Sequence, residues 1–229
     1  WEIARPLMEQ GKMPQLQEMV ARGASGSLRS SPPYLSPMLW TTMATGKSPA
    51  EHGIAGFREF NPSSQSHQPV SSSSRKTKAI WNILSQEGWK THVVGWFATY
   101  PAEPINGVVV SDLFGQAANG NGSKEVIKGL VSPEEMSEDL ASGRVSPEEI
   151  DPGLIEFFIP RFREIDLTRD NRPLALRKRL AELYTYHNAA VVLLQDEVPD
   201  FLTVYYHFID WVCHDFMELA PPQRAGVSG

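Results

Sequence analysis

Ser36 is a residue whose type and position could support chemistry. Ser36-Pro37 opens an apolar segment that ends at Gly46, and serine followed by proline is typical of a helix N-cap and first turn. A hydroxyl there lies beside unpaired backbone N–H groups and the positive end of the helix dipole, which attract anions such as phosphate. Serine needs a base or a metal ion to become a good nucleophile, and no base is adjacent in sequence. From this segment alone, a simple capping role for Ser36 is the more frequent case.

Asp210 and His214 form a second candidate group. They come at and after the end of an apolar, strand-like run from Phe201 to Ile209 and are four residues apart. A carboxylate and an imidazole are suitable ligands for zinc or a similar ion. Zinc takes three or four protein ligands, so the others would come from elsewhere in the fold. On this segment alone, a structural role is also open, with Asp210 capping a turn and His214 on the surface.

Other residues of suitable type are weaker candidates. His207 lies within the apolar run and is expected to be packed or satisfied by a hydrogen-bond partner, and Cys213 is expected to be a small buried residue. His52 precedes Gly53 and is expected to shape the backbone, although it could contact substrate. Four aromatic residues could line a pocket, although such residues are more often part of the core. They are Trp40, Phe57, Trp96 and Tyr100.

Predicted helices and strands alternate around these residues. Apolar periodicity and capping signals predict helices over residues 14–23, 36–46, 77–86 and 173–197, and Ser48-Pro49-Ala50-Glu51 is a capping box that starts another. Short apolar runs predict strands at 91–97, 107–110 and 201–209. VSPEE occurs at 131 and 145, each time with Ser as a predicted N-cap. Residues 61–74 are expected to be an exposed loop, and 119–122 a flexible turn.

This alternation predicts an α/β fold with a mostly parallel sheet and helices on both faces. In such sheets, functional residues gather at the carboxyl ends of the strands. Residues 115–172 are polar, dotted with proline and short of strand patterns, so an inserted helical cap is expected there. No clear linker divides the chain, so residues 1–229 are predicted to belong to one domain.

The composition excludes several functional classes. The chain has 229 residues, 41% of them hydrophobic, which is enough to bury a core. Its net charge of −6 and its lack of a basic run argue against a nucleic-acid scaffold. The longest apolar run, Ala189 to Leu194, is far shorter than the ~20 residues that cross a bilayer. The single cysteine cannot form an internal disulfide, so composition leaves the compartment open.

Three segments carry a resemblance to a known family. They are SPMLWTTMATGKSPAEHGI (36–54), GWFATYPAEPINGVVVSD (95–112) and the run that ends in IDWVCH. In this order they resemble the type I phosphodiesterase and nucleotide pyrophosphatase branch of the alkaline phosphatase superfamily. The joint match of TG-x-x-P-x-x-HGI with a downstream D-x-x-x-H is much more specific than either part. The resemblance therefore favours the functional interpretation of both candidate groups.

The resemblance implies roles for the candidate residues. The family's nucleophilic Thr or Ser lies nine residues before the Thr of the TG pair, which is Thr45 here, so Ser36 is the implied nucleophile. Asp210 and His214 would bind one of two divalent metal ions, with zinc expected, and Ser36 would bind the second. The implied reaction is in-line attack of the Ser36 oxygen on the phosphorus of a small phosphate mono- or diester. A phosphoseryl intermediate would then be hydrolysed, while both ions neutralise charge.

Some of the family's features have no counterpart here. The resemblance calls for an aspartate before Trp1, and for an Asp-His pair and a last histidine beyond Gly229. We therefore expect one incomplete alkaline-phosphatase-like catalytic domain that, in isolation, binds metal weakly and turns over little or no substrate. Nucleotide pyrophosphatases of this branch also carry asparagine five residues after the HGI histidine, where this chain has Phe57, which puts nucleotide substrates in doubt.

Two other functions stay open at this stage. A phosphotransferase or phosphomutase would pass the phosphoryl group from Ser36 to an alcohol and would differ only in the acceptor. A noncatalytic binding module could keep the fold without the metals. A related sulfatase is disfavoured, because its nucleophile lies in a Cys or Ser, x, Pro, x, Arg motif, whereas Ser36 is followed by Pro37-Met38-Leu39-Trp40. The leaving group and the oligomeric state are left open.

Overall fold

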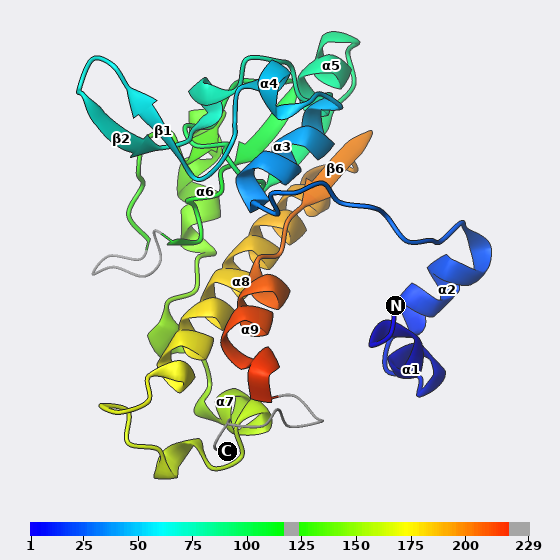
Figure 1. Ribbon diagram of the computed structural model, residues 1–229, viewed down its shortest axis with the longest axis vertical. Coiled ribbons are helices and arrows are strands. Elements are labelled where there is room, and N and C mark those ends of the chain that lie inside the picture. The colour runs from blue at the N-terminus through cyan, green and yellow to red at the C-terminus, as the bar shows by residue number, and fades with distance from the viewer. Residues whose placement is uncertain (117–123, 220–229) are drawn as a thin grey trace. The chain divides into compact units, whose positions relative to one another are not determined.

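The computed structural model of the chain describes residues 1–116 and 124–219 (Figure 1). The chain divides into two compact units, Trp1–Tyr34 and Leu35–Gly229. The first unit contains helices α1 (Ala4–Glu9) and α2 (Pro14–Arg22), and α2 has the bounds that its proline start and glycine end predict. The assignment of residues 1–229 to a single catalytic domain stays a prediction.

The second unit is built around a four-stranded sheet with the order β5-β4-β3-β6. Strand β3 (Thr91–Val94) pairs in parallel with β4 (Gly107–Val110) and with β6 (Phe201–Val204). Strand β5 (Val131–Ser132) pairs with β4 in the antiparallel direction. The fold is therefore α/β with a partly parallel sheet, consistent with an alkaline-phosphatase-like fold. A mostly parallel sheet is not established by these strands.

Helices cover both faces of this sheet. Val94 and Val110 pack in one cluster with residues of the long helix α8 (Arg172–Asp196). Val93 and Val109 point the other way and pack with residues of α3 (Ser36–Thr45) and α5 (Ile80–Gln86). Because successive side chains of a strand point to opposite faces, a strand with no exposed residue must be covered on both. The near-continuous valine runs reflect this double burial.

A third cluster joins the helices beyond the sheet. Helix α9 (Phe208–Phe216) packs along α8. Helix α7 (Pro152–Phe158) lies against the N-terminal half of α8 (Figure 1). Ile155, Leu180 and Val212 come from these three helices and pack together. Helix α9 is thereby held on α8 by its apolar face, which leaves its polar face free to contribute to a site.

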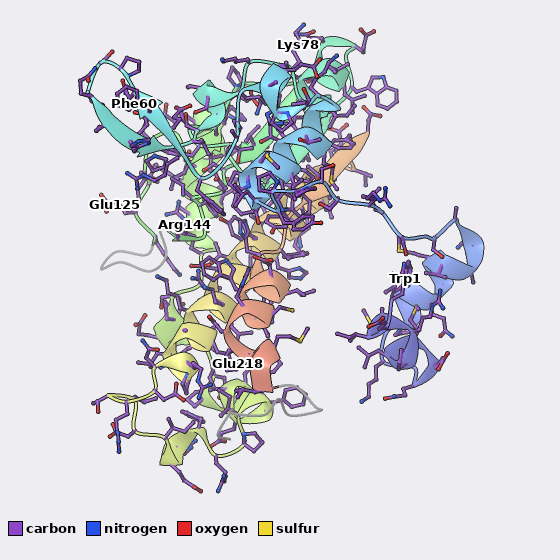
Figure 2. The ribbon with its side chains drawn as sticks, in the orientation of Figure 1. Trp1, Phe60, Lys78, Glu125, Arg144 and Glu218 are labelled. Carbon is purple, nitrogen blue, oxygen red and sulfur yellow. The ribbon has the colours of Figure 1, made fainter. Side chains whose placement is uncertain are left out.

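The expected loop at 61–74 is wrong for much of its length. Strands β1 (Arg58–Asn61) and β2 (Ser66–Pro69) form an antiparallel hairpin, followed by the 3-10 helix η1 (Ser72–Ser74). Figure 2 shows Phe60 on this hairpin. Most of its side chains are exposed, so the sequence lacks the apolar alternation that marks a half-buried strand.

Other local expectations need adjustment. The predicted strand at 201–209 ends at Val204, because α9 begins at Phe208. Ser132 of the first VSPEE is the last residue of β5 and not an N-cap, since the following 3-10 helix η3 (Glu134–Met136) is preceded by Pro133. Ser146 of the second VSPEE does cap the 3-10 helix η4 (Pro147–Glu149) in a capping box. The predicted turn at 119–122 lies outside the described residues.

The segment predicted to be a cap contains several short elements. They are β5, η3, α6 (Ser137–Ser142), η4, α7 and the 3-10 helix η5 (Phe162–Glu164). Its strand β5 joins the main sheet, and the cap itself remains a prediction. The remaining elements are α4 (Pro49–His52) and the 3-10 helix η6 (Met217–Leu219). Across residues 1–116 and 124–219, none of the helices combines the length and apolar character needed to span a membrane.

Candidate functional site

A cavity of about 820 Å³ brings the three sequence-predicted site residues together. Ser36, Asp210 and His214 all line it, although they lie at opposite ends of the second unit's sequence. The other walls come from the base of the β1–β2 hairpin, the turns that follow β3 and β4, and one side of α8. Because β3, β4 and β6 are parallel, the segments after them leave the same edge of the sheet, which is where sites gather in α/β folds.

Ser36 is the first helical residue of α3 and not its N-cap. Leu35 occupies the N-cap position with an extended backbone, one residue before the predicted cap. Because Leu35 and not Ser36 is the N-cap, the simple capping role of Ser36 is wrong. The side chain instead lines the cavity at the positive end of α3.

His52 fixes helix α3 against α4. Its Nδ1 accepts a hydrogen bond from the Ile54 backbone N–H at 3.2 Å, so in the neutral ring the proton is on Nε2. Nε2 lies 3.0 Å from Thr42 Oγ1, which in turn donates to the Met38 carbonyl at 3.0 Å. His52 is fully buried, and this burial lowers its pKa. The predicted conformational role of His52 is therefore confirmed, and the HGI motif positions the helix that carries Ser36.

Gly53 completes this arrangement. It has φ +85°, and a Cβ at this position would meet the Lys76 side chain at 3.0 Å. Both features favour glycine after the buried histidine.

Replacing His52 with alanine should destabilise the fold. The change leaves a cavity and removes the partner of Thr42 and of the Ile54 N–H, so the free energy of unfolding should fall by about 3 kcal/mol. Urea denaturation of the two proteins measures this difference. His67→Ala is the control, since His67 is exposed on the hairpin and its loss should change stability little. Equal stability of the two variants would contradict the role of His52.

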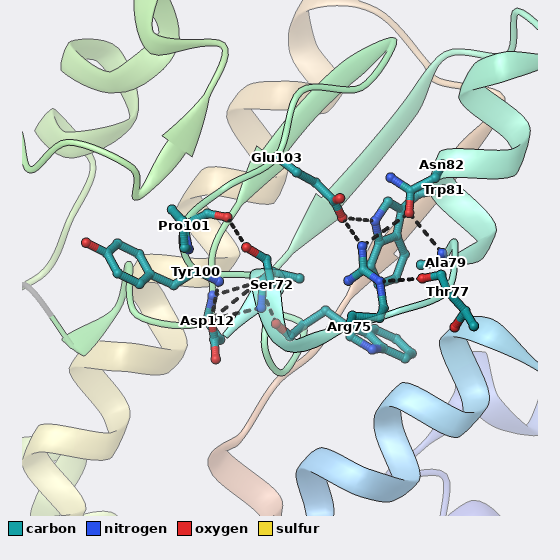
Figure 3. Close-up of polar contacts among 12 residues, drawn as sticks. Ser72, Arg75, Thr77, Ala79, Trp81, Asn82, Tyr100, Pro101, Glu103 and Asp112 are labelled. Atoms are coloured by element: carbon teal, nitrogen blue, oxygen red, sulfur yellow. Dashed lines mark hydrogen bonds and ion pairs between the residues drawn. The ribbon is translucent and has the colours of Figure 1, made fainter. Parts of the chain in front are cut away.

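Asp112 fixes the turn that forms one wall of the cavity. It follows β4, and its carboxylate accepts hydrogen bonds from the backbone N–H groups of Ala98, Thr99 and Tyr100 at 3.0, 3.2 and 3.0 Å. Figure 3 shows Asp112 beside Tyr100. Ala98 adopts φ +55°, a conformation that this carboxylate helps to hold. Burial raises the pKa of Asp112, and the three N–H bonds oppose that shift.

The same turn is also tied to the segment after the hairpin. The Ser72 N–H donates to the Tyr100 carbonyl at 2.8 Å, and the Ser72 hydroxyl donates to the Pro101 carbonyl at 2.7 Å. Arg75 pairs with Glu103 just beyond (Figure 3). The hairpin base and the turn are therefore one connected wall.

Asp210 and His214 lie one turn apart on α9. Asp210 Oδ2 and His214 Nε2 are 3.8 Å apart, and the side chains are 49% and 74% exposed. A carboxylate oxygen and an imidazole nitrogen at this spacing fit two positions of a zinc site. They fit it only in part, because the described residues contain no group of three or more His, Cys, Asp or Glu that could hold a metal ion.

His207 and Cys213 are close in sequence to Asp210 and His214, but neither lies in the position that was expected for it. His207 is not in the strand but at the N-cap of α9, where its Nε2 lies 3.0 Å from the Gly95 carbonyl. Burial lowers the pKa of His207, so its neutral ring donates this hydrogen bond. The expectation of a partner-satisfied His207 is thus confirmed. Cys213 is exposed, so its predicted burial is wrong, because the apolar face of α9 is supplied by other residues.

The charged side chains that line the cavity are acidic. Asp112, Glu182 and Asp210 line it, and none of its described lining residues is Lys or Arg. Arg179 pairs with Glu182 at 2.9 Å and places its guanidinium 3.4 Å from the centroid of the Trp211 ring. Glu182 is thus balanced by Arg179, and an anionic ligand would meet the carboxylates of Asp112 and Asp210.

Asp112 and Glu182 line the cavity but were not among the residues predicted from the sequence. Asp112 comes shortly after the predicted strand at 107–110. Because functional residues gather at the carboxyl ends of strands, its position could have marked it as a candidate. Glu182 is an acidic residue on α8 with no local motif to mark it. Of the four aromatic candidates, Phe57 and Tyr100 line the cavity, whereas Trp40 and Trp96 pack edge-on in the core at 5.0 Å between centroids.

Comparison with models of known protein families gave a match. A family model described as type I phosphodiesterase / nucleotide pyrophosphatase matches residues 3–225. Searches of curated proteins and of solved structures gave no significant match.

Proposed function

We propose, on the premise that this chain belongs to the type I phosphodiesterase / nucleotide pyrophosphatase family of the alkaline phosphatase superfamily, that it is a metal-dependent hydrolase of small phosphate esters with Ser36 as nucleophile. The family supports phosphodiesterase- or pyrophosphatase-type hydrolysis. The observation that carries the residue roles is the single cavity lined by Ser36, Asp210 and His214.

The position of Ser36 suits in-line attack on phosphorus. Its Oγ would form a bond to phosphorus while the bond to the leaving alcohol oxygen breaks, which gives a phosphoseryl intermediate. Water would then cleave the bond between phosphorus and Oγ and regenerate the serine. The unpaired N–H groups of the first turn of α3 would face the negative charge that develops on the phosphoryl oxygens.

The charges of the cavity support metal dependence. Divalent cations held by Asp210 and His214 on one side and by Ser36 on the other would neutralise the phosphate and favour ionisation of the serine hydroxyl. Without them, a phosphate group would meet the carboxylates of Asp112 and Asp210, since Glu182 is paired with Arg179. Zinc suits the oxygen and nitrogen donors. A diester, with one negative charge, is favoured over a monoester with two.

The test is hydrolysis by the purified full-length protein. We expect bound zinc, faster hydrolysis of bis(p-nitrophenyl) phosphate than of p-nitrophenyl phosphate, loss of activity with a chelator, and recovery on addition of zinc. The 229-residue chain by itself should bind zinc weakly, since its described residues provide only one Asp–His pair at the cavity.

Other outcomes would select a different function. A full-length protein that is metal-free and inactive on both esters would support a noncatalytic binding module. Preferential transfer of the phosphoryl group to an added alcohol rather than to water would support a phosphotransferase or phosphomutase.

A further inference from the structure

Arg179 connects helix α8 to helix α9. Its guanidinium carbon lies 3.4 Å from the centroid of the Trp211 ring on α9, and its Nη1 donates to both carboxylate oxygens of Glu182 at 3.1 and 2.9 Å. The side chains of Arg179 and Glu182 are only 19% and 7% exposed. A guanidinium that lies over an indole while it pairs with a buried carboxylate is held in one orientation. Arg179 is therefore a fixed contact between the two helices.

Trp211 has a particular position around the axis of α9. The face of α9 that packs in the cluster with α7 and α8 is made of Phe208, Val212 and Phe216. At 3.6 residues per turn, Trp211 lies on the helix surface between this face and the pair of Asp210 and His214. The contact with Arg179 therefore limits rotation of α9 about its axis.

The direction of the candidate metal ligands depends on this rotation. Asp210 and His214 both line the cavity, yet their side chains are 49% and 74% exposed, so their own packing does little to hold them. Asp210 directly precedes Trp211. A contact that fixes the indole therefore also fixes the backbone from which the Asp210 carboxylate reaches the cavity.

We propose that Arg179 is a positioning residue, which holds Trp211 so that Asp210 and His214 face the cavity at the spacing that a metal ion needs. This proposal rests on the proposed metal-dependent function and adds to it a residue that is not among the described lining residues of the cavity.

The sign of the effect separates positioning from simple electrostatics. Arg179 is a cation near a site for cations, so removing its charge alone should strengthen zinc binding. Removing the contact that orients α9 should weaken zinc binding, because the two ligands are then no longer held in place. Residues that orient metal ligands contribute roughly tenfold or more to metal affinity.

The experiment measures the zinc affinity of the full-length protein by competition with a chromophoric chelator. Arg179→Ala and Trp211→Ala should each weaken zinc binding by roughly tenfold. The double variant should be little weaker than either single variant, because both remove the same contact. Trp211→Phe should retain most of the affinity, since it keeps an aromatic ring under the guanidinium. If Arg179→Ala fails to fold, Trp211→Ala removes the same contact from the helix surface and is compared with Trp211→Phe.

Two neighbours of Arg179 on α8 are the matched controls. Arg177 Nη2 donates to the carbonyls of Glu148 and Ile150 at 3.1 and 3.2 Å, so Arg177→Ala should lower the stability of the protein without changing its zinc affinity. Lys178 is exposed, and Lys178→Ala should change neither quantity.

Several results would overturn the proposal. Zinc binding by Arg179→Ala that is unchanged or tighter, additive losses in the double variant, or an equal loss in Arg177→Ala would each exclude positioning by this contact and leave the hydrolase function standing. A full-length protein that binds no zinc and hydrolyses no ester would overturn the proposed function and this proposal with it.

Discussion

Ser36→Ala is expected to lower the rate of bis(p-nitrophenyl) phosphate hydrolysis by the full-length protein by roughly a thousandfold or more. The reason is chemical, because alanine has no oxygen that can form the bond to phosphorus. Stability should change little, since Ser36 is not the N-cap of α3 and alanine therefore removes no cap. A rate loss with unchanged thermal unfolding therefore separates nucleophile from structural residue.

Three companion measurements make the result specific. Ser36→Thr should retain activity, because threonine supplies the same oxygen, and Ser63→Ala should behave like the unchanged protein, since Ser63 lies at the exposed hairpin turn. Acid quenching during turnover, followed by peptide mapping, should find the phosphoryl group on the peptide that contains Ser36. Activity of Ser36→Ala within tenfold of the unchanged protein would rule out this serine as nucleophile.

Asp210→Asn and His214→Ala are expected to lower both zinc content and hydrolysis, the rate by roughly a hundredfold or more. Each change removes one donor of the only Asp–His pair that α9 presents to the cavity. Raising the zinc concentration should restore part of the activity, because the other ligands remain. Metal analysis after gel filtration, together with a zinc titration of kcat/KM, measures both effects.

Asp215→Asn is the control for this pair. Asp215 lies on the same helix but does not line the cavity, so its replacement should change neither zinc content nor rate. If Asp210→Asn and Asp215→Asn lost equal amounts of zinc, the metal would not be held by Asp210.

The two predictions concern cavity residues that are far apart in the sequence. Replacing Ser36 tests the positive end of α3, and replacing Asp210 or His214 tests the exposed face of α9. If both predictions hold, the cavity is an active site and its acidic character is balanced by metal ions. If only the serine matters, the anion is stabilised by the helix terminus and by groups that come from elsewhere.

Local signals in the sequence were sufficient for several elements. The bounds of α2, the capping box of Ser48 and Glu51, and strand β4 depend on residues within a few positions of each other, so a short stretch of sequence determines them. The family resemblance was also correct, since a type I phosphodiesterase / nucleotide pyrophosphatase model matches residues 3–225.

Elements that depend on distant contacts were not predictable in this way. The β1–β2 hairpin is polar on most of its surface, so no apolar alternation marks its strands. The exposure of Cys213 depends on which face of α9 packs on α8, and the 3.6-residue period of a single short helix does not settle that choice.

The sequence by itself determined the family, the α/β class and the candidate chemistry of Ser36, Asp210 and His214, because each of these depends on residue types at short, fixed spacings. Only the tertiary structure decided that these residues line one cavity, that Asp112 holds a wall of it, and that Phe57 faces it. The physical reason is that strand pairing and helix packing bring together residues more than a hundred positions apart, as β3 and β6 do.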